Sequence, residues 1–356
     1  MDANWWKDRR LALALAFLIP VVLLAVVARL PAARKPVAYR PIVVGFYVDQ
    51  PGDTHSLPSL EKFGRNLNVL SPLWYTMMPD GSLEVKVNRR ALDVARGQGL
   101  KILPLANLGK NDDTILRDPR ARDRAIEGLV SAVRENNYDG LTVDIQLFPE
   151  DGRTFAHDRD LLTDFMRRLR DRLKPMGKEL YMAVVPRFGP SREIAAIYDY
   201  RALADIVDRV AVMTYDSHQE TGPPGQVAPF AWVEENIKES INAGFRPGQI
   251  LLGIATYGYD WPAGESGGFS RPSKEIQDRA ARLGVEVKWS DRYQEPYYLY
   301  TAPNGRTREV WFENRYTLRQ KIELMKKYNL GGIAIWRLGF EEPGFWDVLR
   351  ANFPGR

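Results

Sequence analysis

Eight short runs rich in β-branched and aromatic residues alternate along the chain with longer segments of helical periodicity. The predicted strands are 42–47, 69–74, 101–105, 140–147, 180–185, 210–215, 250–256 and 332–336. The clearest helices between them are expected over 118–136, 158–174 and 232–243. Strands that alternate with helices pair in parallel, and eight is the number that closes a barrel. We therefore predict an α/β fold, the (β/α)8 TIM barrel.

An open, doubly wound parallel sheet is the alternative arrangement of the same elements. Sheets of that kind that bind nucleotides carry a Gly-rich phosphate-binding turn after the first strand. Here the first strand leads into "GFYVDQPGD", which lacks that fingerprint. The barrel is therefore the favoured interpretation.

The connection after the seventh predicted strand is too long for a single crossover helix. Residues 262–313 hold a helical stretch around 273–282 and then "YYLYTAPNGRTREVWF", two strand-like runs joined by a turn at Asn304 and Gly305. Asn-Gly between two such runs is a strong hairpin signal. The pattern predicts a small α+β insertion on the barrel rim.

An uncharged apolar segment, "LALALAFLIPVVLLAVVA", precedes the first strand. As a helix it would cross most of the ~30 Å hydrocarbon layer of a membrane. We predict an uncleaved anchor, with a cleaved signal peptide as the alternative, because Val26 and Ala28 offer small residues before a cleavage point. The barrel is then membrane-anchored on the cell surface or periplasmic side, or secreted if the segment is cleaved. The expected order is basic flank, transmembrane or signal-anchor segment, linker and barrel, over 1–10, 11–28, 29–40 and 41–350.

Charge and composition exclude several classes of function. The net charge of +5 is confined to residues 1–40, and the rest of the chain holds 43 basic and 43 acidic residues. Nothing in that balance predicts a nucleic-acid surface. The chain has no cysteine, and its three histidines, His55, His157 and His218, form no pair with metal-ligand spacing. No metal and no cofactor are expected.

The fourth predicted strand, "DGLTVDIQLFPE", is polar along one face only. A period of two separates Thr142, Asp144 and Gln146 from the apolar Leu141, Val143, Ile145 and Leu147. In a barrel the polar face points inward, and its C-terminal end lines the active site. A buried polar network is the structural alternative. Because a buried carboxylate without a role is costly, we favour a functional site at Asp144.

Two other strand ends carry groups typical of a sugar subsite. The sixth strand ends in "VMTYD", with Tyr215 and Asp216, and the eighth ends in "IAIWRLG", with Trp336. Each residue also has a purely structural alternative role, since aromatic side chains fill cores and aspartate caps helices. Together they place a carboxylate, a phenol and an indole at one barrel mouth. Further substrate-binding candidates at or near strand ends are Asp139, Tyr47, Trp74 and Tyr257.

These segments resemble the family 18 glycoside hydrolases. Their fourth-strand signature, D-G-x-D-x-D-x-E, is matched at Asp139, Gly140 and Asp144. The segments "MTYDSHQETGPPGQVAPFAWV", "ILLGIATYGYDW", "EVWFEN" and "GGIAIWRLG" are similar to strand ends of the bacterial cell-wall and spore-cortex-lytic branch. The resemblance spans about 41–349 and implies a barrel that recognises polymers of β-1,4-linked N-acetylglucosamine, either peptidoglycan or chitin.

The resemblance also implies a substrate-assisted, retaining mechanism in which the 2-acetamido oxygen of the substrate attacks the anomeric carbon. By position, Asp144 orients that acetamide and Tyr215 hydrogen-bonds to it. Asp216 is a supporting group, and Trp336 forms the floor of the subsite. A glutamate two residues beyond the orienting aspartate would protonate the leaving oxygen.

Gln146 stands where that acid is expected, and Thr142 replaces a further aspartate of the signature. An amide keeps the size and hydrogen bonds of glutamate but cannot release a proton. General acid catalysis is worth ~10²–10⁴ in rate, so we expect impaired hydrolysis. A replacement acid is conceivable at Glu150, in "FPEDGR", if that residue folds back over the mouth. The structural alternative is an acidic loop before the next helix.

Three hypotheses follow. The first is a membrane-tethered glycan-binding barrel with little or no catalysis. The second is an active endo-N-acetylglucosaminidase or chitinase-type hydrolase that uses another acid. The third is a scaffold at the cell envelope that recruits a protein.

Overall fold

The computed structural model describes residues 40–50, 54–109, 112–148, 155–190 and 192–353. The predicted anchor over 11–28, its flank, the linker up to residue 39 and Glu150 lie outside these described residues. Within them, no helix is both long and apolar enough to cross a membrane.

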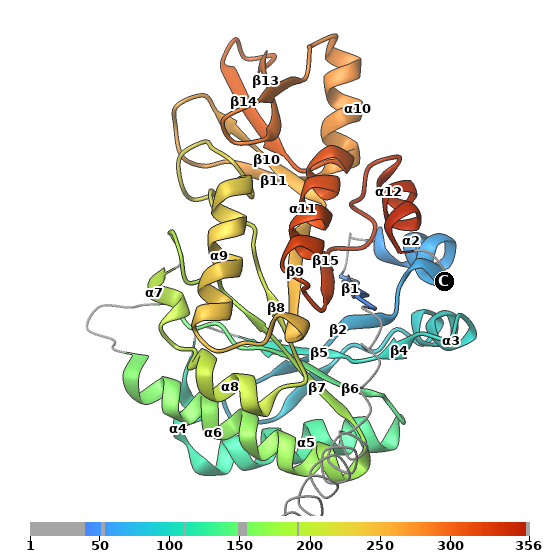
Figure 1. Ribbon diagram of the computed structural model, residues 1–356, viewed down its shortest axis with the longest axis vertical. Coiled ribbons are helices and arrows are strands. Elements are labelled where there is room, and N and C mark those ends of the chain that lie inside the picture. Colours follow the sequence, from blue (N-terminus) through green and yellow to red (C-terminus); the bar gives the residue numbers. More distant parts are fainter. Residues whose placement is uncertain (1–39, 51–53, 110–111, 149–154, 191, 354–356) are drawn as a thin grey trace, which may run out of the picture. The chain divides into compact units, whose positions relative to one another are not determined.

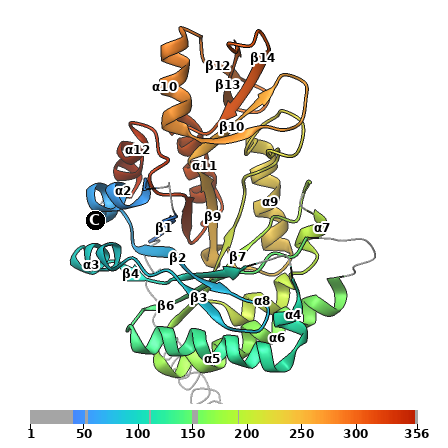
Figure 2. The same cartoon turned by 180° about the vertical axis from the view of Figure 1, so that it is seen from behind.

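Eight parallel strands close into a barrel, as predicted (Figures 1 and 2). They are β1 (Ile42–Tyr47), β2 (Val69–Met77), β5 (Leu105–Leu108), β6 (Gly140–Asp144), β7 (Glu179–Val184), β8 (Arg209–Val212), β9 (Ile250–Ala255) and β15 (Gly332–Trp336). The barrel closes because β1 pairs with both neighbours, Gly45 lying opposite Ile335 of β15 and Leu70 of β2. Two short strands, β3 (Leu83–Val85) and β4 (Lys101–Ile102), also pair with β2.

Helices surround the barrel and cover the outer face of its strands (Figures 1 and 2). They are α2 (Ser56–Phe63), α3 (Arg89–Gly97), α4 (Thr114–Arg117), α5 (Pro119–Glu135), α6 (Phe155–Leu173), α7 (Arg192–Ala195), α8 (Tyr200–Ile206), α9 (Phe230–Asn242), α11 (Arg315–Lys327) and α12 (Phe345–Asn352). Capping residues fix the start of α5. The Asp118 side chain accepts a hydrogen bond from the Arg120 N–H at 2.8 Å, and Pro119 occupies the first turn.

Alternation along the strands separates two apolar layers. The outer layer, between strands and helices, contains Leu141 and Val143 of β6. The inner layer fills the barrel with Val44, Phe46, Leu105, Tyr181, Leu251 and Ala334, among others. Thr142 points inward, where it accepts a hydrogen bond from the Ser71 hydroxyl at 2.9 Å. The predicted division of β6 into an apolar outer face and a polar inner face is confirmed.

The predicted insertion is a five-stranded antiparallel sheet with one helix, shown in orange in Figure 1. The sheet order is β11 (Phe269–Pro272), β10 (Tyr257–Pro262), β14 (Thr307–Phe312), β13 (Glu295–Thr301) and β12 (Lys288–Ser290), with α10 (Ser273–Leu283) beside it. The Asn304–Gly305 hairpin is confirmed, with Gly305 at φ +79°. The predicted start at 262 is wrong, because β10 already pairs with β14 from Gly258 onward.

Two barrel strands end three residues earlier than the sequence pattern predicts. The β6 ladder stops at Asp144 rather than 147, and β8 stops at Val212 rather than 215. Gln146, Tyr215 and Asp216 therefore follow their strands instead of belonging to them. Asp216 adopts a left-handed backbone conformation, φ +62°, which turns the chain just beyond the barrel.

Candidate active site

A cavity of about 210 Å³ lies at the C-terminal ends of the barrel strands. Its lining includes five predicted site residues, Asp144, Gln146, Tyr215, Asp216 and Trp336. A larger hollow, about 750 Å³, lies at the opposite end and is lined by Arg65, Lys101 and Glu179, among others. We assign the site to the smaller cavity, because barrel active sites form at the C-terminal ends of the strands.

The side chains of Asp144 and Gln146 are hydrogen-bonded to each other in this cavity. The Gln146 amide nitrogen donates to both carboxylate oxygens of Asp144, at 2.9 and 3.2 Å. It also approaches the Met213 sulfur at 3.8 Å. Burial raises the pKa of Asp144 to about 6, although the hydrogen bond from Gln146 by itself lowers this pKa. The amide thus holds a carboxylate that borders the cavity.

Asp216 is held by tyrosines of the insertion. Its Oδ1 accepts hydrogen bonds from the hydroxyls of Tyr257 at 2.5 Å and Tyr259 at 2.7 Å. Burial raises the pKa of Asp216, and these two hydrogen bonds lower it. Tyr257, a predicted sugar contact, thus supports Asp216 and is not among the residues that line the cavity. Tyr259 was not predicted, because nothing in a single sequence pairs β10 with the end of β8.

Tyr215 presents a phenol to the same cavity. Burial, followed by the nearby Asp216 and Asp144 carboxylates, raises the pKa of Tyr215 well above its ordinary value. Its hydroxyl is therefore a neutral hydrogen-bond donor at physiological pH. No side chain among the described residues takes up that donor, so it is available to a ligand.

The aromatic wall of the cavity comes from β15 and β1. Trp336 and Phe46 meet edge to face, with ring centroids 5.4 Å apart, and both line the cavity. The sequence-based choice of Tyr47 was wrong by one position on β1. Because successive side chains alternate across a strand, Phe46 points inward while Tyr47 packs outside and contacts Asp49 at 3.2 Å.

Two further predicted contacts lie away from the cavity. Trp74 is buried in the outer layer against Tyr138, with ring centroids 6.1 Å apart. Asp139 lies just before β6, at the N-terminal end of the barrel, where its carboxylate accepts the Ile102 N–H at 2.8 Å. Asp139 therefore joins β4 to β6 and does not reach the mouth.

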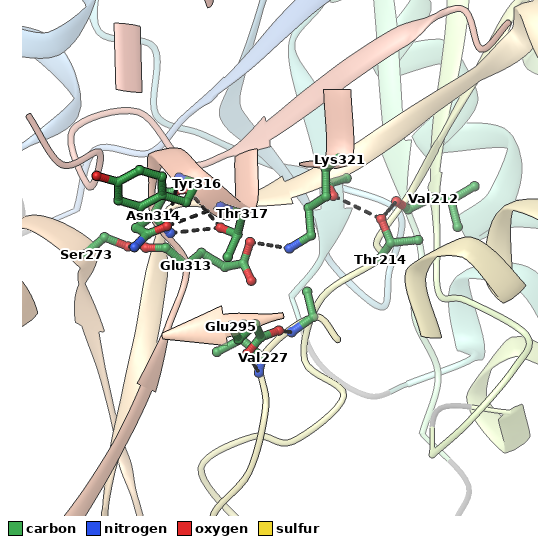
Figure 3. Close-up of polar contacts among 12 residues, drawn as sticks. Val212, Thr214, Val227, Ser273, Glu295, Glu313, Asn314, Tyr316, Thr317 and Lys321 are labelled. Carbon is green, nitrogen blue, oxygen red and sulfur yellow. Dashed lines mark hydrogen bonds and ion pairs between the residues drawn. The ribbon is translucent and has the colours of Figure 1, made fainter. Parts of the chain in front are cut away.

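The loop after Asp216 is fixed by a buried acidic network (Figure 3). The Glu295 carboxylate of β13 accepts the N–H groups of Val227 at 3.0 Å and Ala228 at 2.5 Å. Glu313 is buried nearby and forms an ion pair with the equally buried Lys321 of α11. Burial and the negative charge of Glu313 raise the pKa of Glu295. Since this loop also supplies a cavity residue, the insertion helps to shape the mouth.

The fold and the site together define a β/α-barrel protein whose mouth offers a carboxylate, an amide, a phenol and an indole. The family model for glycosyl hydrolases family 18 matches residues 95–341. The chain belongs to glycoside hydrolase family 18, as its motifs predicted.

Relatives include proteins of the genus Bacillus. The chain is 31% identical over 295 residues to the putative sporulation-specific glycosylase YdhD of Bacillus subtilis, an alignment that covers 78% of this chain and 67% of that protein. It is 28% identical over 303 residues to the cortical fragment-lytic enzyme of Bacillus anthracis. That alignment covers 81% of this chain and 68% of the relative. The crystal structure of the spore cortex-lytic enzyme SleL from Bacillus megaterium has the same fold, with a TM-score of 0.78 and 24% sequence identity. The superposition covers 90% of this chain and 75% of SleL.

Proposed function

We propose that this protein binds polymers of β-1,4-linked N-acetylglucosamine, peptidoglycan or chitin, at the barrel mouth and hydrolyses them poorly. One observation carries the proposal: the residue two positions after Asp144 is an amide, Gln146, and its nitrogen donates hydrogen bonds to both oxygens of Asp144. Family membership supports the ligand class, and the amide supports the loss of acid catalysis.

The cavity matches the parts of an N-acetylglucosamine unit. Asp144 offers a hydrogen-bond acceptor for the amide N–H of the acetamido group, and the free Tyr215 hydroxyl offers a donor for its oxygen. Trp336 provides an apolar surface for a sugar ring. Burial strengthens these polar contacts, because water competes less well in a narrow cavity.

Protonation of the leaving oxygen is the step that lacks a residue. Among the described residues lining the cavity, Asp144 and Asp216 are the only carboxylic acids. Asp216 is occupied by two tyrosine hydroxyls, and Asp144 is needed as a carboxylate against the acetamide. Neither is placed to act as a free acid above the bound sugar. Hydrolysis without one is slower by ~10²–10⁴.

An active hydrolase that uses Glu150 is the alternative, and that residue lies outside the described part of the chain. The membrane tether over 11–28, which would place the barrel outside the cytoplasm, is a further part of the proposal. It rests on the length and hydropathy of that segment alone.

Calorimetric titration with an N-acetylglucosamine hexamer tests the proposal. Saturable binding without released fragments is expected for the wild type. Tyr215→Phe should weaken binding by about two- to tenfold, the value of one hydrogen bond. Tyr316→Phe is the matched control, because Tyr316 lies on α11 and is 52% exposed. Absence of binding would favour the scaffold hypothesis, and rapid release of fragments would favour an active hydrolase.

A further inference from the structure

A second hollow, of about 550 Å³, lies beside the mouth and carries three arginines, Arg159, Arg187 and Arg192. We call it the basic hollow. Glu239 is the only acidic residue among its described lining residues. All three arginines are exposed, and they come from segments that follow the C-terminal ends of β6 and β7. The basic hollow therefore concentrates positive charge next to the C-terminal end of the barrel.

Only one of the three arginines forms an ion pair with a described residue. The Arg159 Nε lies 4.0 Å from the carboxylate of its neighbour Asp160, a long ion pair between two exposed side chains. Arg187 lies over the ring of Tyr200, 5.2 Å from its centroid, a contact that orients the guanidinium without cancelling its charge. Arg192 has no ion pair with any described residue. Exposed guanidinium groups without a close ion-pair partner favour carboxylate and phosphate ligands.

The backbone of the basic hollow is fixed in place by α9. The Phe188 carbonyl accepts hydrogen bonds from the Trp232 indole at 2.7 Å and the Asn236 amide at 3.1 Å. The Phe188 N–H donates to the Asn236 side-chain oxygen at 2.8 Å. With its backbone held in this way, Phe188 remains 48% exposed and lines the basic hollow together with the arginines. The basic hollow thus combines a fixed backbone, an exposed apolar side chain and positive charge.

One segment separates the basic hollow from the active-site cavity. Pro186 and Ile194 line the cavity, whereas the intervening Arg187 and Arg192 line the basic hollow. Tyr198 makes a second connection, since it lines the basic hollow and donates its hydroxyl to the Ile145 carbonyl at 2.9 Å. Ile145 lies between Asp144 and Gln146. A glycan in the mouth would therefore pass close to this charge.

We infer that the basic hollow binds carboxylate groups carried by the glycan, so that the preferred ligand is an acidic, peptide-substituted N-acetylglucosamine polymer and not a neutral one. The inference rests on the proposed function, since the glycan itself lies in the mouth. Phe188 would contact the apolar part of the substituent, and the arginines its carboxylates. A neutral polymer would leave all these groups in water.

The test compares two probes of equal length. One is a neutral N-acetylglucosamine tetramer, and the other is a tetrasaccharide in which alternate sugars carry a lactyl ether with a short peptide ending in a carboxylate. Wild-type protein should bind the peptide-bearing probe about tenfold more tightly at low salt, as expected for two exposed charge contacts. At ~1 M salt the Debye length falls to ~3 Å, and the preference should disappear.

The double variant Arg187→Gln/Arg192→Gln should lose the preference and keep its affinity for the neutral tetramer. Arg65→Gln is the matched control, because Arg65 is exposed and lines the hollow at the opposite end of the barrel. Equal wild-type affinity for the two probes would overturn this inference while leaving the proposed function intact. Failure of both probes to bind would overturn the proposed function, whereas arginine-dependent binding of the peptide-bearing probe alone would support both the proposed function and the basic hollow.

Discussion

Replacement of Gln146 by Glu introduces a carboxyl group where the amide now contacts Asp144. The two side chains differ by one atom, so the new group should occupy the same position without repacking. The present nitrogen lies 2.9 and 3.2 Å from the Asp144 oxygens. A carboxyl oxygen placed there can bond to Asp144 only if one proton is shared between the two groups.

The energy of that pair indicates its protonation state. Two unit charges ~3 Å apart repel by about 5 kcal/mol at an effective dielectric constant of ~20. Burial already raises the pKa of Asp144 to about 6. The pair should therefore carry one proton at neutral pH, as paired carboxyls in other sites do. Under the proposed function, Gln146→Glu thus supplies the missing proton donor.

Hydrolysis of an unmodified N-acetylglucosamine oligomer should rise by ~10²–10⁴ in Gln146→Glu. The rise should be smaller for an aryl glycoside, because an acidic phenol departs with less help from a proton. Chromatography of the oligomer products and fluorescence from the aryl substrate measure the two rates. Gln219→Glu is the control, since it makes the same amide-to-acid change in the lining of the same cavity.

The reasoning is refuted if wild type and Gln146→Glu cleave the oligomer at equal rates. It is also refuted if Gln219→Glu produces the same gain, because the effect would then be one of added charge and not of position.

Three further predictions address the site and its support. The pKa of Asp144, about 6, lies above its unfolded value of 3.8, so ionisation destabilises the fold as pH rises through this interval. Between pH 4 and 7 the unfolding free energy of the wild type should fall relative to Asp144→Asn, by at most ~3 kcal/mol; parallel pH profiles would count against the raised pKa. Trp336→Ala should weaken hexamer binding by about tenfold or more in calorimetry, while Trp289→Ala, a 38% exposed site on the insertion, should bind as the wild type does. Lys321→Met leaves Glu313 buried without its ion pair and should cost ~3–5 kcal/mol in urea unfolding; Lys321→Met/Glu313→Gln should recover most of the loss, and no recovery would contradict a charge-based cause.

The barrel could be predicted because its signals are local. Each strand is a short run of β-branched or aromatic residues, and two of the predicted ranges, 42–47 and 332–336, agree with the structure at both ends. The insertion hairpin followed from Asn304 and Gly305 in the same way. Pairing between consecutive parallel strands then sets the order, and this requires no knowledge of distant contacts.

The site was harder to predict because it depends on register and on distant segments. A pattern with a period of two identifies the faces of a strand, but it does not say which face of β1 points inward, and the choice of Tyr47 over Phe46 was wrong for that reason. Tyr257 and Tyr259 reach Asp216 across 41 and 43 residues of sequence. No local pattern contains such a contact.

Native mass spectrometry of the wild-type protein incubated with an N-acetylglucosamine hexamer tests the central claim most directly, because one spectrum reports both occupancy and cleavage. We predict a one-to-one complex in which the bound hexamer keeps its full mass over hours. Complexes with shorter oligomers, appearing within minutes, would contradict the loss of acid catalysis assigned to Gln146.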